Sequence, residues 1–330
     1  MAEYTKQIHY RLNNATNDIK LYTTVEDVGA NYVSLMDGGA TVYAGLVDPT
    51  DSLASNVRVR RNGNIYALAR ECSAIDPNPG LLLQRTRAGT HTTYYQVGDH
   101  FDIVLNGKLS DSLTMNNETY RAVIVGFDHN KELETGGQHS TTLAICRDTL
   151  GNEISFTEPS GIRGNDVTTG EYFVHHLKKS TNAGGWSSSL IKTVIMTNFY
   201  NALPTEWQGV ISSITKYTDN TGRASRTEAN VTATTEKVFI PAEYEICGLD
   251  YVANVYEKSK QQQYEYFANW KGGTSTANRY GHSLLTLNCS FWSRSQVKST
   301  ASRYSRISAE GVDSSYGYRS YGILPFFTIC

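Results

Sequence analysis

The hydrophobic period of this chain changes in its middle, and that change constrains the fold more than any other feature. Between residues 190 and 199 the apolar side chains recur on one helical face, at Leu190, Ile191, Val194, Ile195 and Phe199. Either Ser187 or Ser188 can cap this helix. A second helix is expected from Pro204, with Trp207, Val210 and Ile211 on its buried side. Strand patterns precede and follow these helices, so the sequence predicts an α+β fold and not a parallel α/β sheet.

Strand-length segments separated by turn residues fill the first seventy positions. They are residues 8–12, 18–25, 31–36, 40–47 and 64–70, and Asp-Gly and Asn-Gly pairs lie among the separators. We therefore expect a small antiparallel β-domain over residues 1–73. The segment 74–93 contains prolines and glycines and is expected to be a linker, in which Leu81–Leu83 could dock on either neighbour.

A larger domain is expected over residues 94–330. Its first strands are predicted at 100–105, 119–129 and 140–148. The segment KVFIPAEYEICG (237–248) predicts a strand, then a short helix that starts after a proline and ends at Gly248. From residue 277 onward the pattern returns to short strands with long polar loops.

Composition argues against several classes of protein. The chain has 30 Lys and Arg against 32 Asp and Glu, without a block of like charge, so we expect no nucleic-acid partner. No apolar run approaches the roughly 20 residues of a membrane-spanning helix, and the N-terminus has no apolar core of a secretion signal. The five cysteines form no CxxC pair and are expected to be small buried hydrophobes rather than disulfides or zinc ligands.

Several motifs in the second half of the chain resemble a family of domains of unknown function found in phage and prophage proteins. In order they are GWSSSLIKTVIMTNFYNALPTEWQGVI, KVFIPAEYEICG, QQQYEYFA, FWSRS, SAEGV and GILPFFTI. The resemblance covers about residues 95–330. That family is similar to a branch of the C-type-lectin-like fold, related to variable proteins diversified by retroelements. The first seventy residues resemble small β-domains that precede such domains in phage virion proteins.

The resemblance implies a C-type-lectin-like C-terminal domain, in which a short antiparallel sheet and two helices hold long irregular loops. It implies a tail or tail-fibre protein of a phage virion, made in the host cytoplasm, whose N-terminal domain attaches to other virion proteins. The C-terminal loops would bind a host cell-surface protein or glycan, and a diversity-generating retroelement would vary them over about residues 278–327. Such proteins are often trimers, although no heptad repeat enforces a homo-oligomer here.

Residues 294–321 have the Tyr, Ser, Gly and Arg composition of an antibody paratope. Tyr offers a large amphipathic ring at low entropy cost, and Arg adds planar donors. We expect ISAEGV and YGILPFF to be scaffold strands and the Ser, Tyr and Arg runs to be loops. The expected ligand-binding residues are Arg294, Gln296, Lys298, Arg303, Tyr304, Asp313, Ser315, Tyr316, Tyr318, Arg319 and Tyr321. Ordinary soluble loops have a similar composition, and the resemblance favours binding.

Two other functions stay open. One is a purely structural role in the virion, as a capsid decoration or tail-spacer protein. The other is an unrecognised hydrolase of host glycans, although the chain has no nucleophile elbow, HExxH or paired-carboxylate signature. We expect no enzyme, no cofactor and no metal site.

The neighbouring residues predict whether several histidines, tryptophans and Arg294 are buried or exposed. His129 and His139 flank an acidic loop and are expected in a solvated hairpin, and His175 and His176 at least partly at the surface. Arg294 either pairs with a buried carboxylate or reaches the surface. The tryptophans expected to be buried are Trp186, Trp270 and Trp292.

Overall fold

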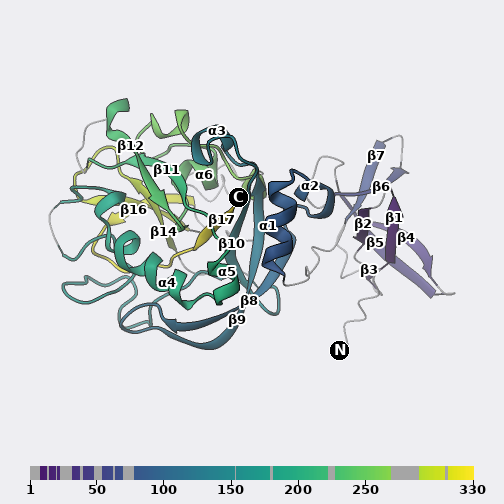
Figure 1. Cartoon of the computed structure of the whole chain (residues 1–330), viewed down its shortest axis with the longest axis horizontal. Coiled ribbons are helices and arrows are strands. Elements are labelled where there is room, and N and C mark those ends of the chain that lie inside the picture. Colours follow the sequence, from purple (N-terminus) through teal and green to yellow (C-terminus); the bar gives the residue numbers. More distant parts are fainter. Residues whose placement is uncertain are drawn as a thin grey trace. The chain divides into compact units, whose positions relative to one another are not determined.

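The structure, a computed structural model, describes residues 78–330 except 153, 179–180, 222–226, 269–289 and 309–310, and before residue 78 only the backbone of the strands β1 to β7. The chain divides into two compact units (Figure 1). One comprises Met1–Ile75 with Thr92–His100, and the other comprises Asp76–His91 with Phe101–Cys330.

The smaller unit contains antiparallel strands, as expected. Strand β1 (Ile8–Leu12) pairs with β2 (Ala15–Ile19). A second sheet has the order β3 (Leu21–Tyr22), β5 (Ala40–Val47), β7 (Asn64–Ala69) and β6 (Ala54–Arg61), and β4 (Tyr32–Asp37) also pairs with β5. The registers Asp37 to Ala40 and Arg61 to Asn64 are those of hairpins, as the Asp-Gly and Asn-Gly pairs predict. The strand pattern missed β6 and most of β2, which begins at Ala15 in a stretch expected to be a turn.

A five-stranded sheet organises the larger unit. Its order is β13 (Val238–Phe239), β17 (Phe326–Ile329), β10 (Thr141–Asp148), β9 (Thr114–Phe127) and β8 (His100–Lys108). The β13–β17, β17–β10 and β10–β9 pairs are antiparallel. The C-terminal strand β17 thus lies between two neighbours, and Phe326 and Phe327 are fully buried. The predicted strands at 100–105, 119–129 and 140–148, and the core role of the last apolar run, are confirmed.

Helix α1 (Pro79–Arg87) forms within the segment that we expected to be a linker. Asn78 caps it, because the Leu81 N–H donates to Asn78 Oδ1 at 3.0 Å and Pro79 fits the first helical position. Leu82 is fully buried. The helix lies beside β17 and α5 (Thr205–Gln208), as Figure 1 shows. This part of the segment therefore docks on the larger unit.

The central helical stretch is less regular than its period predicts. A 3-10 turn (Trp186–Ser188) precedes a π-helical turn (Ile191–Ile195), which continues into α4 (Met196–Ala202). The cap is Ser189, whose Oγ accepts a hydrogen bond from the Lys192 N–H at 3.1 Å, and not Ser187 or Ser188. Val210 is only half-buried, because α5 already ends at Gln208.

Shorter elements complete the larger unit. Strands β11 (Ile214–Asp219) and β12 (Val231–Glu236) form a hairpin. Helix α6 (Glu243–Cys247) ends at Gly248, which has the left-handed φ of 64° that its prediction as a C-cap requires. The remaining turns are α3 (Lys131–Glu134) and three 3-10 turns, Glu228–Asn230, Glu257–Ser259 and Glu265–Phe267. Helix α2 (His91–Tyr94) has only its first residue, His91, in the larger unit.

A three-stranded antiparallel sheet contains most of the expected binding region. It consists of β14 (Phe291–Gln296), β15 (Arg303–Ser308) and β16 (Gly311–Tyr316). The prediction of loops for the Ser, Tyr and Arg runs is therefore wrong for β15 and β16, and ISAEGV spans the connection between them. The physical reason is the hairpin register, which pairs Ser308 with Gly311 and gives the polar residues on both sides regular backbone partners.

The larger unit is thus mixed α and β with mostly antiparallel sheets, in agreement with the coarse expectation. Among the residues that the structure describes, no helix is long and apolar enough to cross a membrane.

Candidate functional site

The segment Tyr316–Gly322, which follows β16, carries most of the expected binding residues at the surface. Its backbone is held by a stretch of chain that is distant in sequence. The Val167 N–H donates to the Tyr318 carbonyl at 2.8 Å, and the His175 N–H donates to the Gly317 carbonyl, also at 2.8 Å. Because these bonds fix the backbone, its side chains extend from a rigid base.

Gly317 brings this segment close to the core. A Cβ atom at position 317 would lie 2.6 Å from Nε2 of His176 and 2.9 Å from Cδ2 of Tyr304. Both distances are too short for normal contact, so the close approach requires a residue without a side chain.

Exposed and half-exposed side chains from β15, β16 and the following segment form what we call the tyrosine–arginine surface. Its members are Arg303, Arg306, Asp313, Tyr316, Tyr318, Arg319 and Tyr321. The rings of Tyr316 and Tyr318 stack with centroids 5.2 Å apart and planes inclined by 11°. The guanidinium of Arg303 lies 4.6 Å from the Tyr316 centroid, and that of Arg319 lies 5.9 Å from it. A guanidinium group is attracted to the face of an aromatic ring, so these arginines and tyrosines restrict one another's orientation.

Arg306, Asp313 and Tyr321 form a second cluster, because Arg306 and Asp313 face the opposite side of the β15–β16 hairpin from Arg303 and Tyr316. A hydrogen bond between Arg319 and Tyr321 links the two clusters. The Arg306 guanidinium lies 4.8 Å from the Tyr321 centroid, and its Nη2 donates to Asp313 at 2.5 Å. On its other side the Tyr321 ring meets the fully buried Trp292 edge-on, with centroids 5.1 Å apart. Tyr321 thus connects the surface to the core.

Asp166 joins the tyrosine–arginine surface to a neighbouring loop. Its carboxylate lies 2.9 Å from Lys178 Nζ and 3.4 Å from Arg319 Nε. The hydrogen bond from Lys178 lowers the pKa of Asp166, and a hydrogen bond with Arg303 likewise lowers the pKa of Tyr316. These exposed pairs contribute little stability and mainly orient side chains. Asp166 also lines a cavity of about 200 Å³ formed by the 161–169 segment and Tyr172.

Four expected binding residues, Arg294, Gln296, Tyr304 and Ser315, are buried and do not reach the surface as that prediction requires. For Arg294 the alternative, pairing with a buried carboxylate, is confirmed. All six residues of β14 are buried, because this strand packs against β11, α6 and the 186–188 turn. Gln296 Nε2 donates to the Asn182 carbonyl at 2.9 Å, and Ser315 Oγ donates to the Tyr321 hydroxyl at 3.2 Å. Lys298 is half-exposed in the β14–β15 connection, where its backbone N–H donates to the Val252 carbonyl.

His175 is buried as well, in contrast to the expected surface position. Its ring stacks on Tyr304 and meets Trp292 edge-on at 4.9 Å. Burial lowers the pKa of His175 well below its usual value and raises that of the Tyr304 phenol. His176 is half-buried and Trp186 and Trp292 are fully buried, as expected, whereas Trp270 lies outside the described residues.

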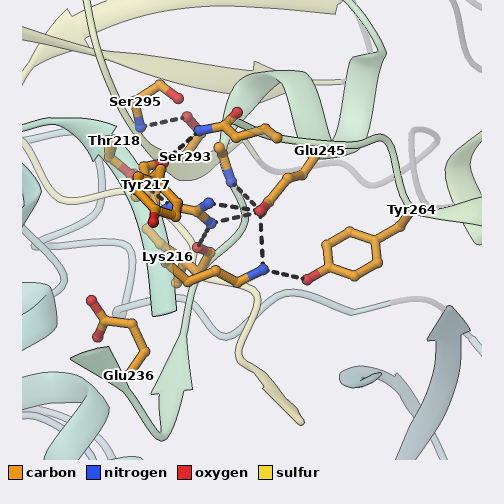
Figure 2. A network of polar contacts seen from close by, with 12 residues as sticks. Lys216, Tyr217, Thr218, Glu236, Glu245, Tyr264, Ser293 and Ser295 are labelled. Carbon is orange, nitrogen blue, oxygen red and sulfur yellow. Dashed lines mark hydrogen bonds and ion pairs between the residues drawn. The ribbon is translucent and has the colours of Figure 1, made fainter. Parts of the chain in front are cut away.

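Arg294 belongs to a buried ion network (Figure 2). Its Nη1 and Nη2 each donate to one carboxylate oxygen of Glu245 at 2.6 Å, a bidentate pair. Lys216 Nζ donates to Glu245 at 3.1 Å, to Glu134 at 2.7 Å and to the Tyr264 hydroxyl at 2.9 Å. Burial opposes ionisation of Glu245, but the charges of Arg294 and Lys216 overcome it and lower the pKa of Glu245. The network holds β14, β11 and α6 together through these hydrogen bonds and ion pairs. Because its side chains are buried, none of them is exposed to bind a ligand.

The sequence contains a signal for part of this network. In β11 the residues Ile214, Lys216 and Thr218 lie on one inward face. A lysine on the same face of a strand as a buried isoleucine indicates a buried acidic partner, because an unpaired charge would be too costly there. The partner Glu245 has no comparable signal, because a glutamate in the first turn of a short helix is usually solvated.

The loop between His129 and His139 is only partly solvated. His129 is buried, stacks on Tyr264 with ring centroids 3.6 Å apart, and shares a 2.7 Å hydrogen bond with the Gln262 carbonyl. The prediction of a solvated position is therefore wrong for His129. His139 is 40% exposed in its side chain and hydrogen-bonds to Asp128 at 2.8 Å.

The cysteines agree with their expected packing role as far as the structure describes them. Cys146 and Cys247 are buried free thiols, and Cys330 is a half-buried one. Cys72 and Cys289 lie outside the described residues.

One family matches the chain. The model of the family described as Domain of unknown function (DUF6273) matches residues 164–330, which include β11 to β17 and the tyrosine–arginine surface. No curated protein and no solved structure has a significant match to the chain.

Proposed function

The chain belongs to the DUF6273 family, and from this premise we propose that it is a receptor-binding protein of a phage virion. In this proposal the tyrosine–arginine surface binds a host cell-surface protein or glycan. The small N-terminal unit attaches to other virion proteins in the tail or a tail fibre.

The observation that carries the proposal is the mutual stacking of tyrosine and arginine side chains on a fixed backbone. Stacking orders Tyr316, Tyr318 and their arginines before any ligand arrives. A binding surface ordered in advance loses less conformational entropy when the partner docks. Tyr and Arg are also the residues that contribute most binding energy at protein interfaces.

The geometry favours recognition over a broad face. Aromatic rings and guanidinium groups stand side by side, and the adjoining cavity at Asp166 holds only about 200 Å³. Rings of this kind stack on the apolar faces of sugars or on side chains of a protein, while the arginines and Asp313 supply hydrogen bonds at the rim.

We further propose that the larger unit is a branch of the C-type-lectin-like fold. A short antiparallel sheet, two helical segments and polar C-terminal segments support this assignment. If a retroelement diversifies the chain, the buried strand β14 restricts variation to the exposed positions of β15, β16 and the segment after them. A neighbouring reverse-transcriptase gene with a template copy that differs at those codons would support this; their absence from the genome would leave a receptor binder with an invariant surface.

Binding to host cells tests the proposal. The purified full chain is labelled and mixed with cells of the bacterium that carries or propagates the phage. The combined change Tyr318→Ala and Arg319→Ala should reduce cell binding at least about tenfold, since it removes two interface-type side chains. The matched control is Tyr256→Ala, which removes a 40% exposed tyrosine outside the tyrosine–arginine surface and should bind as the unmodified chain does.

Equal binding by the double variant and the unmodified chain, with both folded, would overturn the proposal. Imaging of labelled virions distinguishes receptor binding from the alternative, a purely structural role in the virion. A position at an exposed tail tip agrees with receptor binding, whereas a position enclosed in the shell or tube indicates a structural role.

A further inference from the structure

Three side chains from separate parts of the larger unit converge near the β9–β10 connection. They are His91 at the start of α2, Asp128 directly after β9 and His139 shortly before β10. Their ligand atoms, two imidazole nitrogens and a carboxylate oxygen, all lie within 4.8 Å of one another. His139 Nδ1 lies 2.8 Å from Asp128 Oδ2, and His91 Nε2 lies 3.7 Å from Asp128 Oδ1. The carboxylate therefore lies between the two rings, with one oxygen facing each.

His91 is the member whose environment needs an explanation. Its side chain is 1% exposed, and the backbone of Thr86 and Arg85 offers its ring only weak hydrogen bonds, none of normal geometry. The ring packs against Phe127 with centroids 5.1 Å apart. A buried polar group left without a partner costs about 1–3 kcal/mol, so native proteins rarely leave one unless it has a use.

The gap between His91 and Asp128 has the size that a metal ion requires. Two ligand atoms that share a tetrahedral zinc ion at about 2.0–2.1 Å lie roughly 3.3 Å apart. The 3.7 Å between His91 Nε2 and Asp128 Oδ1 is too long for a hydrogen bond but close to this separation.

We propose that His91, Asp128 and His139 form a binding site for a divalent transition-metal ion of the zinc type. Two imidazoles and one carboxylate are a donor set suited to such ions. The backbone N–H of Ser140 donates to Asp128 Oδ1 at 2.8 Å and orients the carboxylate, as the partners of metal ligands commonly do. Three protein ligands leave at least one coordination position for water or another ligand.

The position of His139 makes the site accessible. Its half-exposed ring lines a cavity of about 330 Å³ together with Arg87, Gly137, Gln138 and Cys330. Gly89 allows this ring to approach the turn that leads to His91, since a Cβ atom at position 89 would lie 2.7 Å from His139 Nε2. His139 is therefore the member of the cluster that borders this cavity, and His91 is the buried member.

Titration with zinc tests the site. The full chain, freed of any polyhistidine tag and treated with a chelator, is titrated with Zn²⁺ in a calorimeter and in competition with a coloured zinc chelator. One ion per chain is expected. Asp128→Asn and His139→Gln should each weaken binding more than about 100-fold, beyond the effect typical for removal of a group that only orients a ligand. Asn can keep the shape and the Ser140 contact at position 128, so this variant should fold.

The matched control is Asp102→Asn, which removes a half-exposed carboxylate elsewhere on the unit and should leave zinc affinity unchanged. Substitution with Co²⁺ gives a second readout, because its visible spectrum distinguishes a tetrahedral site from surface-bound ions. Absence of a saturable site, or unchanged affinity in both Asp128→Asn and His139→Gln with normal circular dichroism, would overturn the proposal.

Discussion

Tyr304 and His175 stack face to face inside the larger unit, with ring centroids 3.6 Å apart and planes inclined by only 3°. Neither side chain reaches solvent by more than 1% of its area. Tyr304 lies on β15 and His175 on the segment that holds the Gly317 carbonyl, so this pair connects the tyrosine–arginine surface to the core.

The stacked pair predicts that two tyrosines of the same region, Tyr304 and Tyr318, differ strongly in their effect on stability. Tyr304→Ala should lower the free energy of unfolding by about 3–5 kcal/mol, since it empties a large buried site. Tyr318→Ala should change it by less than about 1 kcal/mol, since Tyr318 is half-exposed. Urea unfolding of both variants measures the difference, and equal effects would contradict this account of the core.

The Arg294–Glu245 pair predicts strong coupling between two buried charges. Arg294→Met and Glu245→Gln alone should each cost about 3–5 kcal/mol, because each leaves a buried charge without its partner. The double variant should cost clearly less than the sum of the two. A double-mutant cycle by chemical denaturation measures the coupling, and strict additivity would show that the two side chains do not stabilise each other.

The close contacts around Gly317 predict that the fold does not tolerate even a methyl group at this position. Gly317→Ala should destabilise the fold by about 1–3 kcal/mol, because the new Cβ would overlap His176 and Tyr304. Gly161→Ala is the matched control, since nothing lies within 4 Å of a Cβ atom there. The melting temperatures of the two variants should therefore differ, and a Gly317→Ala variant as stable as the control would show that the segment can shift outward.

The buried Glu243 predicts a stability that falls as pH rises. Burial raises the pKa of Glu243 to about 7, against a 2.9 Å hydrogen bond from the Val252 N–H that favours the charged form. The folded state thus keeps a proton that the unfolded state releases above its ordinary value of 4.5. This contribution is fully present below pH 4.5 and is lost as pH rises through about 7, by as much as about 3 kcal/mol.

Glu243→Gln should remove this pH dependence. The difference in unfolding free energy between the unmodified chain and Glu243→Gln should therefore change from pH 5 to pH 8, in favour of the variant at the higher pH. Glu206→Gln, at an exposed position of α5, serves as the control and should show a difference that stays constant over this range. A constant difference for Glu243→Gln as well would mean that Glu243 is already ionised at pH 5 in the folded state.

Much of the fold could be predicted from local patterns, and the errors have a common cause. Gly248 ended its helix as expected because a C-cap glycine acts within one turn. The run before Tyr316 was wrong as a loop because Ser, Tyr and Arg suit both loops and strands, and only pairing with a neighbouring strand decides between them.

The candidate sites depended even more on distant contacts. Tyr316, Tyr318, Arg319 and Tyr321 do lie at least partly at the surface, since Tyr316 ends β16 and the other three follow it. Tyr304 has the same composition around it and is buried, because His175 packs on its ring from more than a hundred residues away in sequence. The cluster of His91, Asp128 and His139 unites three segments that no short motif joins.

The sequence by itself determined the alternation of strands and helices, the core role of the last apolar run and the concentration of tyrosine and arginine before it. These properties depend on neighbours along the chain, through hydrophobic period and turn chemistry. Only the tertiary structure decided which tyrosines face solvent, that Arg294 pairs inside with Glu245, and that two histidines meet around Asp128. Burial and pairing depend on which segments pack together in space, and a linear pattern contains no measure of those distances.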